Sequence, residues 1–294
     1  MMSQEEVIIF KNVGAQEYQT FANQAIKYAL ISVAFTYNRM DKSKLSARIN
    51  NITKGKIAEF LFYEFCRQNG VLIDPEACST PFWKPDNRDF LWIGGEWDIK
   101  NNYFYCSDLD FKNFDCTKLP ALIPNKTHYD QWSKRNDHLI ADSRFNAYVF
   151  TFMRLRPNDK NFFSLLLSED QLSFITSIVD QHNKSNQQNM PFMDSWFFQK
   201  LNENVPSKYF ALNYHPEIII TGCANPRYWE MFKDIPSNDD SLPYITHTSN
   251  SNWYQQKDGW VSFLNGTLVT KIKNRTCPVS LLPSFSSVIK KHVR

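Results

Sequence analysis

The sequence predicts an α/β protein in which a mixed central sheet is flanked by helices. Three observations favour this class. Apolar residues recur at helical spacing over residues 16–38 and again over 53–68. An alternating stretch with a Gly-Gly dipeptide predicts a β-hairpin over 89–105. Ala147–Leu155 is a predominantly apolar run, which is typical of a strand buried on both faces.

Composition sets broad limits on function. The 294 residues are 43% hydrophobic and include 24 Phe, which is enough for a substantial core. The formal net charge of +3 is compatible with nucleic acid as a partner. No apolar run approaches the roughly 18 residues of a membrane span, and the first ten residues do not resemble a signal peptide. We therefore expect a cytoplasmic protein with no membrane partner.

Several common chemistries lack their usual signals in this chain. Six cysteines include no C-x-x-C pair, so reduced, partly buried thiols are expected rather than a zinc site. There is no P-loop, no G-x-G-x-x-G fingerprint and no G-x-S-x-G elbow. Nucleotide-driven, dinucleotide-dependent and serine-hydrolase chemistry are therefore not indicated.

The second predicted helix carries acidic residues inside an apolar pattern. Thr53 can cap its start and Gly70 can end it. Almost every side of the helix is apolar, yet Glu59 and Glu64 interrupt it. A buried carboxylate needs a partner, a metal ion or a proton. One of these two acids is therefore a candidate for a functional role.

The hairpin that follows brings charged side chains together. If the dipeptide at 94–95 forms the turn, Leu91 pairs with Asp98 and Asp89 pairs with Lys100. Directly opposed residues share a face, so Asp89, Asp98 and Lys100 should project from one face of two adjacent strands. Two carboxylates and an ammonium could together hold a divalent ion and polarise a water molecule or a phosphate.

This hairpin resembles the active site of the PD-(D/E)XK nuclease superfamily, which includes restriction endonucleases, junction resolvases and repair nucleases. The matching residues are Pro85-Asp86 followed by Asp98-Ile99-Lys100. The resemblance implies a restriction-endonuclease-like core in which the first acid and Asp98 bind Mg²⁺. It also implies that Lys100 orients or activates the attacking water.

Two residues compete for the role of the first acid. Asp86 follows Pro85 as the family pattern requires, whereas Asp89 has the strand parity that places it beside Asp98. We favour Asp89 and keep Asp86 as the alternative. In the preceding helix, Gly55–Glu59 resembles the family's G-x-x-x-E run, which implies a further metal or water contact from Glu59, with Glu64 in reserve.

A basic stretch lies at the start of this region. Residues 39–58 contain one acid, Asp41, and six cations: Arg39, Lys42, Lys44, Arg48, Lys54 and Lys56. Cations beside a metal site suit contact with the phosphate backbone of DNA. We expect such contacts from Lys42, Lys44, Arg48 and Lys54, and the alternative is a solvated loop.

The predicted elements after the hairpin are less regular. Residues 106–127 contain prolines at 120 and 124 and are expected to be irregular, whereas 128–143 have a helical pattern. Beyond the buried strand, residues 161–167 predict another strand. Ser168–Gln171 then matches a capping box at the start of a helix.

A polar run at 181–189 predicts a linker or a long exposed loop. It would divide the chain into a catalytic core, residues 1–180, and a C-terminal α+β region, residues 190–294. That region is rich in aromatic residues and predicts a hairpin over 259–272 that turns at Asn265-Gly266. We expect it to read DNA or to form a homodimer.

Together these features predict a Mg²⁺-dependent endodeoxyribonuclease that hydrolyses phosphodiester bonds of double-stranded DNA, as type II restriction enzymes do. Within nucleases, a junction resolvase or a repair nuclease is the alternative. A different class also stays open, namely a catalytically inactive module that binds nucleic acid or protein on the same fold. The enzyme requires the acids and Lys100 together, whereas the binding module would tolerate their loss.

Overall fold

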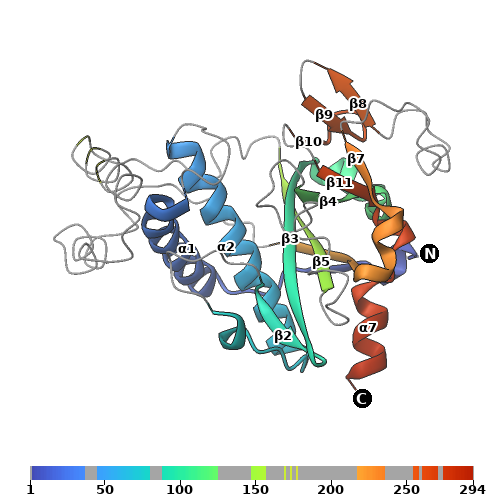
Figure 1. Cartoon of the computed structure of the whole chain (residues 1–294), viewed down its shortest axis with the longest axis horizontal. Helices are drawn as coiled ribbons and strands as arrows, with labels where there is room; N and C mark the ends of the chain where they lie inside the picture. Colours follow the sequence, from blue (N-terminus) through green and yellow to red (C-terminus); the bar gives the residue numbers. More distant parts are fainter. Residues whose placement is uncertain are drawn as a thin grey trace.

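The computed structural model describes residues 2–36, 45–79, 88–124, 147–156, 217–235, 254–257, 260–270 and 274–293, together with 169, 173 and 177. These residues form a mixed α/β fold (Figure 1). Its α-helices are α1 (Ala15–Thr36), α2 (Leu45–Gln68), α3 (Asp108–Phe111) and α7 (Phe285–His292). Its strands are β1 (Ile8–Phe10), β2 (Phe90–Trp92), β3 (Gly95–Tyr105), β4 (Pro120–Pro124), β5 (Ala147–Leu155), β6 (Ile218–Ala224), β7 (Lys233–Ile235), β8 (Tyr254–Lys257), β9 (Trp260–Phe263), β10 (Leu268–Thr270) and β11 (Asn274–Pro278).

The largest sheet has the strand order β1-β6-β5-β3-β2. Strands β3 and β5 run parallel, and the other neighbours run antiparallel, so the predicted mixed sheet is confirmed. Every residue of β5 is buried, as its apolar sequence predicted. The parallel ladder pairs Asp98 with Tyr148, which places a phenol beside the predicted acid.

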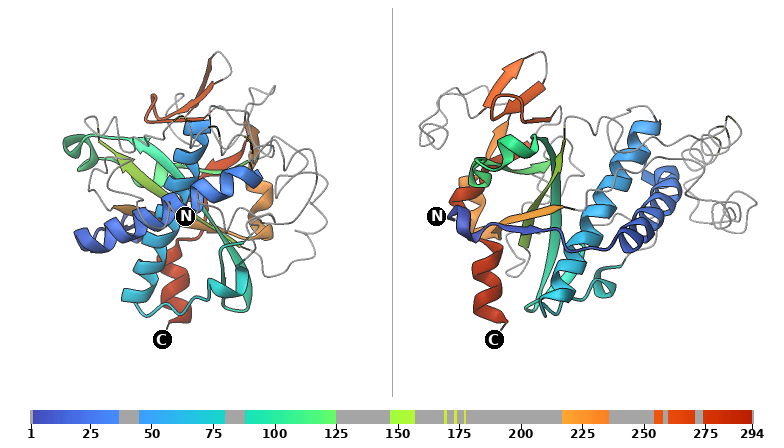
Figure 2. Two further views of the ribbon diagram at one scale, coloured as in Figure 1. Left: turned by 90° about the vertical axis from the view of Figure 1, so that its left-hand side faces the viewer. Right: turned by 180° about the vertical axis from the view of Figure 1, so that it is seen from behind.

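Two apolar cores lie on the two sides of this sheet. Helices α1 and α2 pack together along one side, and the small sheet β4-β11-β7 lies on the other (Figures 1 and 2). Alternate residues of β5 enter different cores: Val149 belongs to the core that includes Leu61 of α2, whereas Phe150 belongs to the core that includes Leu122 of β4. The sheet is therefore covered on both faces, as its apolar central strands require.

Helix α2 is longer than the sequence pattern predicted. It begins at Leu45, so Thr53 lies inside the helix, where its Oγ1 donates a hydrogen bond to the Ile49 carbonyl at 2.8 Å. The predicted cap at Thr53 is wrong because threonine can satisfy its hydroxyl within a helix as well as at its start. The predicted end is confirmed, since Gly70 has a φ of +70° just beyond the helix.

The hairpin forms where predicted, but in a different register. Its turn falls on Ile93 and Gly94, with φ of +50° and +71°. Leu91 consequently pairs with Glu96, not with Asp98. Moving the turn by one residue changes each partner by two, and a change of two leaves each side chain on its predicted face. The register prediction is wrong, yet the conclusion about strand faces does not depend on it.

The stretch predicted to be irregular, 106–127, contains helix α3 and strand β4. Strand β4 pairs with β11, and its two prolines occupy its ends. A proline is tolerated at the first residue of a strand, because it then removes no interior ladder hydrogen bond. The predictions for 128–143, 161–167 and 181–189 lie outside the described residues. Of the helix predicted from Ser168, the described residues are 169, 173 and 177, and all three are helical.

The C-terminal part of the chain completes the main sheet. Strand β6 lies between β1 and β5, and β11 pairs with β4, so residues after 217 contribute to both cores. The predicted division between a core at 1–180 and a separate region at 190–294 differs from this topology. The predicted hairpin is confirmed: β9 pairs with β10 around a loop in which Asn265 and Gly266 have positive φ.

All six cysteines are unpaired and five of them are buried, as predicted for reduced thiols. Within the described part of the chain, no helix is both long enough and apolar enough to cross a membrane.

Candidate active site

Asp89 lies directly before β2 and is fixed by groups from two elements. Its backbone N–H donates to the Trp97 carbonyl at 2.8 Å, and its Oδ2 accepts a hydrogen bond from the Ile99 backbone N–H at 2.5 Å. The Tyr63 hydroxyl of α2 donates to the Asp89 carbonyl oxygen at 3.0 Å. The acid that strand parity favoured is therefore held between the hairpin and the helix that carries Glu59.

Asp98 and Lys100 occupy alternate positions of β3 and form an ion pair, with Lys100 Nζ 2.7 Å from Asp98 Oδ1. A second cation, Arg88, places a guanidinium nitrogen 3.9 Å from Asp98 Oδ2. The ring of Tyr148 lies beneath both cations, 5.5 Å from Lys100 Nζ and 5.6 Å from the guanidinium carbon of Arg88. A buried carboxylate is thus flanked by two cations over one aromatic face.

Glu59 approaches from α2 together with a lysine of the same helix. Lys56 Nζ lies 2.6 Å from Glu59 Oε2, and the same ammonium sits 4.5 Å from the centre of the Tyr28 ring. Both side chains are largely buried. The reserve candidate, Glu64, has its carboxylate engaged by Arg67 and Gln68 instead. Of the two acids that interrupt the helix, the structure therefore places Glu59 near Asp89.

The charge on Asp89 is opposed by its burial and by two neighbouring acids. Burial raises the pKa of Asp89 well above its usual range, and the negative charges of Glu59 and Asp98 raise that pKa further. The charge of Lys56 and the hydrogen bond from Ile99 act in the opposite direction but do not outweigh these effects. Asp89 is thus linked by charge both to Glu59 of α2 and to Asp98 of β3, and Asp98 in turn pairs with Lys100.

This raised pKa gives a prediction about stability. At a pH below the unfolded-state pKa, Asp89 is protonated in both states and adds nothing. At higher pH the unfolded state loses the Asp89 proton first, while the folded state still retains it. The free energy of unfolding therefore falls as the pH rises, and the loss is complete above the folded-state pKa. We expect Asp89→Asn to be more stable than the wild type near neutral pH and equal to it in acid.

Urea unfolding measured over a series of pH values tests this expectation. Asparagine can still accept the hydrogen bond from Ile99, so the substitution removes charge rather than shape. Glu96→Gln is the matched control, because that acid lies on the same hairpin with 56% of its side chain exposed. An Asp89→Asn protein that is less stable than the wild type at neutral pH would contradict the prediction.

The predicted DNA-contacting cations that the structure describes are buried or half-buried. Arg48 is only 4% exposed. Lys54 is half-buried, its Nζ lies 5.1 Å from the centre of the Tyr103 ring, and burial lowers its pKa. Lys42, Lys44 and the alternative first acid Asp86 lie outside the described residues, so contact of these cations with DNA stays a prediction.

Two contributors to the site were missed by the sequence analysis, Arg88 and Tyr148. Arg88 directly precedes Asp89, and its cation next to a predicted metal ligand is a signal that the sequence does contain. Tyr148 enters through the parallel pairing of β3 with β5, which no local pattern reveals.

The donor atoms of the site suit a hard divalent cation, because carboxylate oxygens are the ligands that Mg²⁺ prefers. Asp89 supplies a buried carboxylate whose ionisation is opposed by its acidic neighbours, and a cation would relieve that repulsion. Among the described residues, however, no group of three or more His, Cys, Asp or Glu side chains is arranged to hold a metal ion. Lysine ammonium groups instead contact Glu59 and Asp98.

Comparison of the chain with family models, with curated proteins and with solved structures finds no match in any of the three. The residues of this site are therefore the evidence for its function.

Proposed function

We propose that the protein is a Mg²⁺-dependent endodeoxyribonuclease that cleaves double-stranded DNA, with its active site on the β2–β3 hairpin. The observation that carries this proposal is that Asp89 feels the charges of Glu59 and Asp98, while Asp98 forms an ion pair with Lys100. The order of these residues along the chain is that of the PD-(D/E)XK nucleases, which the hairpin resembles. A restriction-like enzyme remains the version of this activity that we favour.

Each residue of the site has its own proposed role. Asp89 and Asp98, with Glu59, would hold the metal ion, which when bound supplies positive charge against the phosphate. Lys100 can donate a hydrogen bond to the attacking water or to a phosphate oxygen, since its ammonium carries three donors. Arg88 can bind phosphate oxygens through its planar guanidinium, which suits phosphate better than a lysine does. We assign additional contacts with the phosphate backbone of the DNA to Lys42 and Lys44.

Metal binding can be tested without measuring cleavage. A ligand that binds the folded state raises the unfolding temperature, so Mg²⁺ should raise the Tm of the wild type. We expect Asp98→Asn and Asp89→Asn to show much smaller increases, because each removes an anionic oxygen ligand. Differential scanning calorimetry across a Mg²⁺ titration gives the shift, and Glu96→Gln should behave like the wild type. Equal increases in all four proteins would place the ion elsewhere.

A second function is favoured by one feature, the pairing of Glu59 with Lys56 and of Asp98 with Lys100 at 2.6 and 2.7 Å. Carboxylates neutralised by lysines suit a structural charge cluster, and a protein with such a cluster could bind DNA without cutting it. In that case Mg²⁺ would leave plasmid DNA intact while the protein still bound it. Incubation with plasmid and Mg²⁺, followed by sequencing of any cut ends, separates the two functions.

A further inference from the structure

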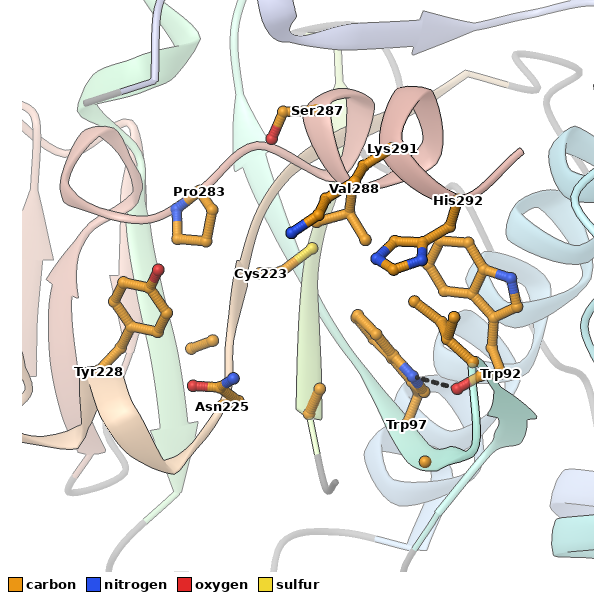
Figure 3. A pocket seen from close by; sticks show the side chains of 14 residues that line it. Trp92, Trp97, Cys223, Asn225, Tyr228, Pro283, Ser287, Val288, Lys291 and His292 are labelled. Carbon is orange, nitrogen blue, oxygen red and sulfur yellow. Dashed lines mark hydrogen bonds between the residues drawn. The ribbon is translucent and has the colours of Figure 1, made fainter. Parts of the chain in front are cut away.

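A pocket of about 440 Å³ lies away from the acidic residues, between the hairpin turn, helix α7 and the 3-10 helix at Pro226–Met231 (Figure 3). Its volume falls within the range of small-molecule binding sites. Trp97 lines this pocket, and the next residue of β3 is Asp98. Successive strand residues project to opposite faces, so the pocket and the Asp98–Lys100 pair lie on different sides of β3.

One wall of the pocket is aromatic and held in place. The Trp97 indole N–H donates to the Trp92 carbonyl at 3.0 Å, and the two indole rings are 5.2 Å apart. Trp97 also stacks on Phe90 at 5.9 Å, and the His292 ring lies 6.5 Å from Trp92. Both indoles are almost fully buried, so their positions are set before any ligand arrives. This rigid wall can bound a flat ligand ring along the exposed edges of the indoles without ordering further side chains.

The other groups around the pocket are polar or cationic. Figure 3 shows the Lys291 amine directed into the pocket near Cys223, with Tyr228 and Asn225 on the side facing the tryptophans. Asn225 Oδ1 accepts a hydrogen bond from the Arg227 backbone, which leaves its amide N–H groups as donors. The lining residues, within the part of the chain that the structure describes, include no carboxylate. The pocket therefore suits an aromatic ligand that carries negative charge.

We propose that this pocket binds a single nucleotide unit, with the base stacked on the ring of Tyr228 opposite the tryptophan wall and the phosphate bound by Lys291. Bases stack on aromatic side chains in a manner that tolerates any sequence, and an ammonium group is a common phosphate ligand. The unit can come from a free nucleotide or from one residue of a DNA strand. The inference does not require that the acidic site cleave DNA.

Isothermal titration calorimetry with each of the four 2′-deoxynucleoside 5′-monophosphates tests the proposal. We expect one site per chain, with Lys291→Met weakening the affinity about tenfold or more, because a charge-assisted contact to phosphate is lost. Lys290→Met is the matched control, since Lys290 neighbours Lys291 in α7 but does not line the pocket. It should bind like the wild type, and a nucleoside without phosphate should bind the wild type about as weakly as a monophosphate binds Lys291→Met.

A second variant separates stacking from charge. Tyr228→Leu removes an aromatic ring from the pocket and keeps Lys291, so it should weaken binding of the monophosphates but not of inorganic phosphate. A single-stranded oligonucleotide that displaces the bound monophosphate would identify a DNA strand as the source, and failure to displace it would identify the free nucleotide. Absence of monophosphate binding at millimolar concentration, or equal losses in Lys290→Met and Lys291→Met, would overturn the proposal.

Discussion

Asp98→Asn should lower the rate of Mg²⁺-dependent plasmid cleavage by about a hundred- to a thousandfold and leave DNA binding intact. The loss follows from the role proposed for this carboxylate, since electrostatic groups at a reacting phosphate commonly contribute that much to catalysis. Asparagine has the size of aspartate, so the packing against Tyr148 should survive. Cleavage rates measured by gel electrophoresis, with binding measured by fluorescence anisotropy, separate the two effects.

The other members of the site refine this test. Lys100→Met should cause a comparable loss, whereas Glu96→Gln, at an acid of the same hairpin with 56% of its side chain exposed, should cut at the wild-type rate. Asp86→Ala and Asp89→Ala compared side by side identify the first acid, and we expect the larger loss at Asp89. Cleavage by Asp98→Asn at the wild-type rate would remove the proposed active site from this hairpin.

Glu217→Ala should lower the free energy of unfolding by about 3–5 kcal/mol, because it leaves a buried cation without its main partner. Arg154 Nε lies 2.9 Å from Glu217 Oε1, and the two side chains are only 3% and 4% exposed. Lys11 Nζ also lies 2.9 Å from Glu217 Oε2, but most of that lysine is exposed. Most of the decrease in the free energy of unfolding should therefore come from the buried guanidinium of Arg154.

Asp108→Ala is the matched control for this prediction. Asp108 accepts a hydrogen bond from the same Arg154 at 2.7 Å, but 69% of its side chain is exposed. Because the Asp108 carboxylate lies in solvent, its loss should cost less than the loss of Glu217. Urea unfolding at neutral pH gives both values. Equal losses in the two variants would show that burial of the pair does not determine its contribution.

The same pair should make stability depend on pH. Burial by itself would raise the pKa of Glu217, but hydrogen bonds from Arg154 and Lys11 outweigh burial and lower it. A lowered folded-state pKa means that the stabilisation is complete above the unfolded-state pKa and disappears as the pH falls through the folded-state value. The difference between wild type and Glu217→Ala should therefore narrow in acid.

Local patterns in the sequence predicted those parts of the fold that depend on neighbouring residues. The strand predicted at Ala147–Leu155 has the predicted first and last residues, and Gly70 marks the end of α2 as predicted. The hairpin register failed because its turn uses Ile93 at a φ of +50°, a conformation that is rare for a β-branched residue. A Gly-Gly dipeptide fits either position of such a turn, so the sequence could not distinguish the two registers.

The residues of the site likewise divide into those that local sequence patterns predict and those that depend on pairing with distant strands. Asp98 and Lys100 could be grouped from strand alternation alone, because a period of two survives the change of register. Tyr148 could not be found in this way, since its place beside Asp98 depends on the pairing of β3 with a strand about fifty residues later. The position of β6 inside the main sheet was not predicted. The aromatic composition after residue 190 indicates a change in residue content but does not indicate the order of strands.

The position of β6 also determines when the protein can fold as it is made. Strand β1 begins at residue 8, yet the strand it pairs with, among those described, begins at residue 218. A growing chain must therefore emerge from the ribosome almost to that point before its first strand can be hydrogen-bonded, and contacts so distant in sequence form slowly. A chain released early lacks the strand that joins β1 to β5. The acidic hairpin thus gains its full support only late in synthesis, when most of the polypeptide already exists.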